Sequence, residues 1–208
     1  MSLITFAIGT VVNILVAYAV PNPTIVALAF VFEVVILVQL FEAVGWHNLK
    51  EGQNSTGAAN GLVIAVMIQP IVLALALLSV SEASPSAKYV AATIAFIYAG
   101  WCLYVLSRAS PPHVNETCSH LDYYWWDDFP GNSWPYLIAL FAIGLLLIRP
   151  FDLGIFVAIY LAVTLGLSAL FYRRNIGSIW CWFGAFGMAF IALYWYLREL
   201  YINQPSLE

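Results

Sequence analysis

Five side chains of this sequence have the chemistry of zinc ligands: Glu42, His47, Cys118, His120 and Asp122. Carboxylate, imidazole and thiolate groups are the donors that Zn²⁺ takes in proteins, and a zinc-bound water is a nucleophile for hydrolysis. Their spacing does not define a site by itself, because the sequence has no His-Glu-x-x-His motif and His47 has no histidine four residues away. A membrane-embedded, metal-dependent hydrolase is therefore one hypothesis, and polar side chains that simply face water are the alternative.

A second set of polar residues, Asn13, Glu33 and Gln69, lies within long apolar runs. An ionisable group that faces lipid costs at least a few kcal/mol, so Glu33 is expected to face other helices, protonated or paired with Gln69 or Asn13. Pro70 removes a backbone donor directly after Gln69 and predicts a kink there. Polar atoms at such a kink, opposite Glu33, predict an intramembrane ligand site. A hydrogen bond that only holds the first three helices together is the alternative.

These side chains must be positioned by helices, because apolar runs of membrane-spanning length recur almost from end to end. A bilayer core roughly 30 Å thick needs about 20 apolar helical residues, and inside it each backbone amide is satisfied within its own segment. Seven such runs are present: 3–20, 24–45, 60–80, 88–107, 134–149, 152–172 and 177–197. They predict an all-α, polytopic membrane protein, a single seven-transmembrane-helix bundle over residues 1–208.

The composition supports this fold class and limits the partners. Hydrophobic residues make up 63% of the chain and charged residues 9%, whereas a soluble domain carries about 25% charged residues. A net charge of -4 with only seven Lys and Arg argues against nucleic acid as a partner.

The sequence also limits the cofactors. Retinal would need a lysine in the last helix and haem would need histidines inside the helices, and the sequence offers neither. The expected partners are the lipid bilayer, a small apolar ligand, and a second copy or another membrane protein. No cofactor is expected, and zinc, through the hydrolase hypothesis, is the alternative.

The connection 108–133, between the fourth and fifth helices, is long and aromatic: RASPPHVNETCSHLDYYWWDDFPGNS. Its aromatic side chains need a surface, which predicts a segment that lies on the membrane interface or over the mouth of the bundle. It falls on the face where the chain begins, which we call side A. Two glycosylation sequons, at Asn54 and Asn115, fall on side A as well. In a eukaryotic host they favour an N-terminus outside and a C-terminus inside.

Polar residues also predict how the second and sixth helices pack. Glu33 and Glu42 are nine residues apart, about half a revolution on a helix, so the second helix is expected inside the bundle with neighbours on both sides. Gly45 is expected to allow a break near its end. In the tight turn after the fifth helix, Arg149 and Asp152 are placed to form an ion pair.

Four stretches resemble an uncharacterised seven-helix membrane family that is associated with large DNA viruses and algae: Phe32 to Gln39, Gln69-Pro70, Cys118 to Trp125, and Gly177 to Cys181. The resemblance covers most of the chain, from the second helix to the seventh. It implies that Glu33, Gln69, Cys118, His120 and Trp180 belong together as a group. The family has no established activity, so the resemblance implies no reaction.

The function favoured by these patterns is a non-enzymatic one, the binding or transport of a small or lipid-like ligand in an intramembrane pocket. Glu33 is the expected polar anchor and Gln69 its partner, with Asn13 and Trp180 beside them. The hydrolase described above is the first alternative. The second is an assembly subunit whose aromatic faces pack against partner membrane proteins.

Overall fold

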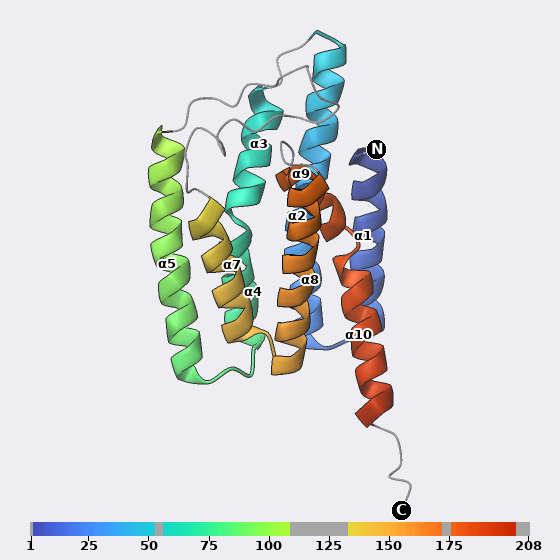
Figure 1. The fold of residues 1–208 in the computed structure, drawn as a ribbon, viewed down its shortest axis with the longest axis vertical. Coiled ribbons are helices and arrows are strands. Elements are labelled where there is room, and N and C mark those ends of the chain that lie inside the picture. The colour runs from blue at the N-terminus through green and yellow to red at the C-terminus, as the bar shows by residue number, and fades with distance from the viewer. Residues whose placement is uncertain (1, 53–55, 109–132, 172–175, 203–208) are drawn as a thin grey trace, which may run out of the picture.

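The computed structural model describes residues 2–52, 56–108, 133–171 and 176–202, and within these ranges the chain is helical, with short turns. The helices, in chain order, are α1 (Ser2–Ala19), α2 (Pro23–Lys50), α3 (Thr56–Met67), α4 (Gln69–Val80), α5 (Pro85–Arg108), α7 (Ser133–Leu147), α8 (Phe151–Phe171), α9 (Ile176–Gly184) and α10 (Gly187–Ile202). They run up and down in one bundle, with α3 and α4 forming one bent rod and α9 and α10 another (Figure 1). The N-terminus lies at the upper end in that view, which is side A.

The apolar helices are long enough to cross a bilayer, which confirms the prediction of an all-α, multi-pass membrane protein. Five segments pass by length and composition: α1, α2, α5, α8 and the α9–α10 segment from Ile179 to Ile202. The α3–α4 pair makes a sixth if the bent rod counts as one span, and α7 is shorter. The predicted bounds shift by a few residues at several ends, and α2 is the longest helix at 28 residues.

Helix α2 is the interior helix of the bundle, as its two polar faces predict. In its most apolar stretch 61% of the residues are buried, against 22% in α1 and 28% in α8. It packs against α1, α3, α4, α9 and α10. The helix starts at Pro23, where the Asn22 side chain accepts hydrogen bonds from the backbone N–H groups of Thr24 and Ile25 at 2.9 and 3.3 Å. The break expected at Gly45 is wrong, because the helix continues through this buried glycine to Lys50.

The predicted kink at Pro70 is present and divides the expected run 60–80 into two helices. Helices α3 and α4 meet at Ile68 at an angle of 45°. Pro70 stands in the first turn of α4, where its missing N–H costs nothing. Above the bend, the Met67 carbonyl accepts a hydrogen bond from the Tyr98 hydroxyl of α5 at 3.0 Å. The bend therefore places Gln69 at the start of a new helix in the middle of the bundle.

The ion pair expected between Arg149 and Asp152 is wrong. Asp152 instead accepts hydrogen bonds from Arg198 Nε at 2.8 Å and from the Tyr194 hydroxyl at 2.7 Å, both on α10. Arg149 donates to the carbonyls of Leu145 and Ile148 at the end of α7. The partner of Asp152 is therefore Arg198, near the end of α10, and local sequence spacing cannot show a partner so distant in the chain.

Glycines allow α10 to approach α2 closely. A Cβ built on Gly187 would lie 2.2 Å from Phe32 Cε1, and one on Gly184 would lie 2.7 Å from Val35 Cγ1. Both glycines flank the interruption between α9 and α10. Small residues at helix interfaces are the usual means of close packing between membrane helices.

We expect Gly187→Ala to lower the free energy of unfolding by about 1–3 kcal/mol, because the new methyl group has to displace the buried Phe32 ring. Gly166→Ala on α8 is the control, since a Cβ there meets no atom within 4 Å. Thermal unfolding of both variants in detergent measures the difference. Equal stability of the two variants would contradict the close α2–α10 contact.

Candidate functional site

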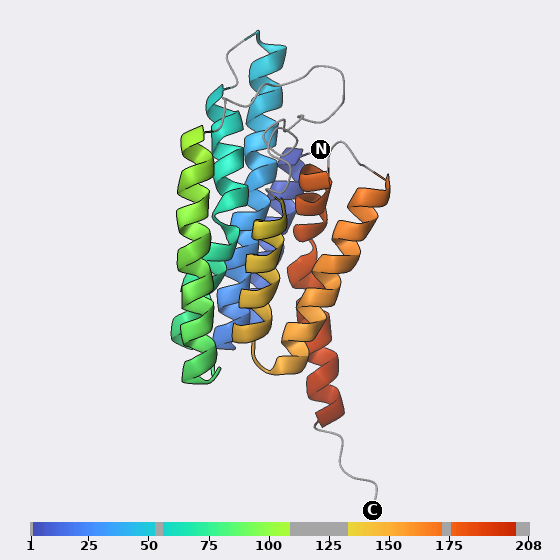
Figure 2. The same cartoon turned by 60° about the vertical axis from the view of Figure 1, so that its left-hand side comes forward.

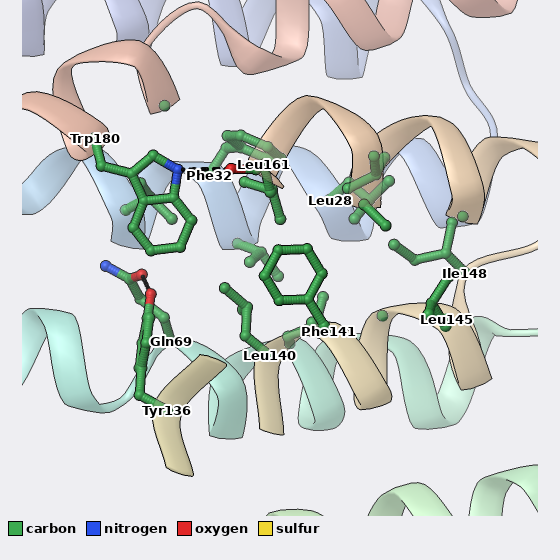
Figure 3. Close-up of a pocket in the computed structure, with 18 of the residues that line it drawn as sticks. Leu28, Phe32, Gln69, Tyr136, Leu140, Phe141, Leu145, Ile148, Leu161 and Trp180 are labelled. Carbon is green, nitrogen blue, oxygen red and sulfur yellow. Dashed lines mark hydrogen bonds between the residues drawn. The ribbon is translucent and has the colours of Figure 1, made fainter. Parts of the chain in front are cut away.

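A narrow cleft lies between α2, α4, α7, α8 and α9 (Figure 3). Its empty space is about 640 Å³ when the open solvent at its mouth is included, but the centres of water-sized molecules fit into only about 40 Å³ of it. Apolar side chains make up nearly all of its walls. The lining residues are Leu28, Val31, Phe32, Val35, Gln69, Leu73, Tyr136, Leu140, Phe141, Gly144, Leu145, Ile148, Gly154, Val157, Ala158, Leu161, Trp180, Cys181 and Gly184. A concave, mostly apolar space with few polar groups is the usual form of a small-molecule site.

The cleft opens sideways, between α7 and α8. Its back wall, from α2 and α4, includes the buried side chains of Leu28, Phe32 and Leu73. Most of its partly exposed lining residues, such as Phe141 and Ala158, lie on α7 and α8, and Val35 of α2 is partly exposed as well. Figure 2 shows α8 leaning away from α7 as the two helices leave their common turn. In a membrane this mouth faces the lipid.

The polar end of the cleft is the Gln69 amide. Its Oε1 accepts a hydrogen bond from the Tyr136 hydroxyl at 2.5 Å (Figure 3). Its Nε2 is buried and has no hydrogen-bond partner among the described residues, and the whole residue is 2% exposed. A buried donor left without an acceptor costs about 1–3 kcal/mol. Gln69 therefore has an unused donor that a bound molecule can satisfy.

Trp180 closes the side-A end of the cleft. Its Nε1 donates to Thr164 Oγ1 at 3.0 Å and to the Leu161 carbonyl at 3.2 Å, so the indole nitrogen is already used by α8. The indole ring meets the Tyr136 ring edge-on, with centroids 6.0 Å apart and planes at 88°. Gln69 and Trp180 therefore line the same end of the cleft, and their role in binding a ligand stays a prediction.

Acidic groups lie next to this end. The Cys181 thiol lies close to the Gln69 amide, and the Glu42 carboxyl group lies within electrostatic range of that thiol. Glu42 is 1% exposed, and its Oε2 accepts a hydrogen bond from Ser2 Oγ at 3.0 Å. Cys181 is a buried free thiol. The polar end of the cleft thus has an acid nearby, and none of the lining residues is Lys, Arg or His.

Glu33 belongs to a separate polar cluster, between α1 and α2. Its carboxylate accepts hydrogen bonds from Thr10 Oγ1 at 2.7 Å and Asn13 Nδ2 at 3.0 Å. The expected pairing with Asn13 is confirmed, and the expected partnership with Gln69 is wrong. The reason is helical rotation: Phe32 faces the cleft, and the next residue is turned by about 100° towards α1.

The residues of the predicted zinc site are only partly within the described ranges. Cys118, His120 and Asp122 lie outside them, as do the two sequon residues Asn54 and Asn115. Among the described residues, no group of three His, Cys, Asp or Glu side chains is placed to hold a metal ion. Glu42 is buried, whereas His47, five residues further along α2, is exposed. Zinc binding stays a prediction.

Sequence reasoning missed two contributors, Tyr136 and Thr10. Tyr136 lies near the start of a strongly apolar helix, and Thr10 precedes Asn13 by almost one turn. A polar atom within an apolar helix is itself a signal that a partner exists on a neighbouring helix. No protein-family model matches the chain, and no curated protein or solved structure matches it either. The site has to be understood from its own geometry.

We expect Glu33→Leu to lower the free energy of unfolding by about 1–3 kcal/mol, because the buried Asn13 amide loses its acceptor. Glu33→Gln should cost less than about 1 kcal/mol. Asn13 Oδ1 has no partner among the described residues, so a turned Asn13 amide can accept from the new Gln NH₂ group. Unfolding in detergent measures both, with the exposed Glu82→Gln as control. Equal losses for the two Glu33 variants would show that the negative charge itself is required.

Proposed function

We propose that the protein binds a lipid-like ligand in the cleft between α7 and α8, with Gln69 at the polar end of the site. The observation that carries this proposal is the unpaired Nε2 of Gln69, buried at one end of an otherwise apolar space. A molecule that fits must combine an apolar body with at least one polar atom. Lipids have this chemistry and are the molecules that meet a mouth within the bilayer.

The proposal includes seven membrane crossings, with α7 as the short one. The 15 residues of α7 span roughly 22 Å, less than a bilayer core of about 30 Å. The helices alternate in direction along the chain, and α7 lies between α4, α5 and α8 in the bundle. The N-terminus outside, and membership of the virus and algal family, remain parts of the proposal that rest on the sequence alone.

Glu33 and Asn13 have a supporting role in this proposal. They hold α1 against α2 on the face of α2 that is turned away from the cleft. The Leu28 and Phe32 side chains of α2 form part of the back wall. The cluster therefore fixes the helix that carries the wall without touching the ligand.

A photoreactive fatty-chain lipid tests the proposal. Added to the purified protein in bilayer nanodiscs, it should crosslink to residues of α7 and α8 that line the mouth. Ala158→Trp should reduce crosslinking at least several-fold, because the indole fills a lining position. Val163→Trp is the matched control on α8, since Val163 is 54% exposed and does not line the cleft. Crosslinking that is even over all lipid-facing helices, or that ignores Ala158→Trp, would contradict a site in the cleft.

A further inference from the structure

This inference rests on the proposed function, which leaves the kind of lipid open. The polar groups at one end of the cleft limit which head group a bound lipid can have. Three polar groups meet there, from Gln69, Tyr136 and Trp180. The Tyr136 hydroxyl donates to Gln69 Oε1, and the indole nitrogen donates to α8. Gln69 Nε2 is the donor left over in the described part of the chain. The ligand atom that fits beside it is a hydrogen-bond acceptor.

The charge around that donor selects against an anionic head group. Cys181 lies beside the Gln69 amide, Glu42 lies within electrostatic range of that thiol, and the lining residues include no Lys, Arg or His. Among the described lining residues a carboxylate or phosphate would be buried without a cation, which is strongly unfavourable. A cationic head group would place its positive charge, and any N–H donors that it carries, against the Gln69 Nε2 donor. An uncharged oxygen, such as an ester or ketone carbonyl, can accept a hydrogen bond from Gln69 Nε2. It buries no charge and places no second donor beside the amide.

The shape of the cleft fits one chain. The lining residues along α7 run from Tyr136 to Leu145, and Ile148 lies just past the end of this helix. A rise of 1.5 Å per residue makes the stretch from Tyr136 to the end of α7 roughly 16 Å long, close to the length of a long fatty chain. Ile148 is 1% exposed and closes the far end near the turn into α8. The space between these two ends is narrow and walled by aliphatic and Phe side chains. A second chain would have to remain outside the mouth.

We propose that the ligand is a neutral, single-chain lipid whose carbonyl oxygen accepts a hydrogen bond from Gln69 Nε2, with its chain running along the α7–α8 mouth towards Ile148. Its head lies towards side A and its tail towards the opposite face. A single fatty chain with an ester or ketone group is neutral and has a carbonyl acceptor. A fatty-acid anion is not neutral, and a plain hydrocarbon has no acceptor.

Competition against the photoreactive lipid tests this assignment, with three competitors of equal chain length: monopalmitoylglycerol, palmitate at a pH where it is ionised, and hexadecane. Monopalmitoylglycerol should displace the probe roughly tenfold better than hexadecane, the value of one good hydrogen bond. Palmitate should be the weakest. In Gln69→Leu the advantage of monopalmitoylglycerol over hexadecane should disappear, while hexadecane itself competes as before.

Gln69→Leu removes the amide to which the Tyr136 hydroxyl donates, so the double variant Gln69→Leu/Tyr136→Phe provides the same test with both polar groups removed. Equal competition by all three lipids in the wild type would overturn the carbonyl assignment while leaving the cleft as a lipid site. Palmitate as the best competitor would overturn the neutral head group. Failure of the probe to label the cleft at all would reject the proposed function together with this inference.

Discussion

Polar atoms in the core of a bilayer have no water to bind, so each of them must find a partner on a neighbouring helix. This constraint explains the arrangement of the bundle. Glu33 joins α2 to α1, the Gln69–Tyr136 bond joins α4 to α7, and Trp180 joins α9 to α8. The Tyr98 hydroxyl joins α5 to the carbonyl of Met67 at the bend. Apolar packing fills the space between these bonds, but it is the bonds that fix which helix faces which.

Two interrupted rods stand on either side of the central helix. The first is interrupted at Pro70, where a missing N–H and a ring clash end one helix and start the next. The second is interrupted between Gly184 and Gly187, where the absence of side chains lets α10 approach α2. Residues that line the cleft lie close to each interruption. Gln69 is the first residue of α4, and Trp180 and Cys181 lie in the last turns of α9. Local breaks in regular structure therefore place the polar end of the site.

Local chemistry was predictable from the sequence, and long-range partners were predictable only in part. The apolar runs and the kink at Pro70 follow from the properties of single segments, and the structure has both. The choice of Asn13 over Gln69 as the partner of Glu33 depends on the rotation of α2, which an error of one residue in position changes by about 100°. Tyr136 reaches Gln69 across 67 residues of sequence. No spacing rule connects residues so far apart, and the same is true of Arg198 and Asp152.

The leaning of α8 away from α7 has a consequence for exchange with the bilayer. The hydrogen bonds that hold α7 run to α4, through Tyr136, and those that hold α8 run to α9 and α10, through Trp180 and Asp152. The printed hydrogen bonds of Tyr136 and Trp180 thus run away from the seam between α7 and α8, and the two rings meet edge-on beside it. Lipid tails are as apolar as the aliphatic side chains of the cleft lining, so a tail that enters the seam replaces one set of dispersion contacts with another. Parting this seam would therefore cost apolar contacts and leave these hydrogen bonds in place.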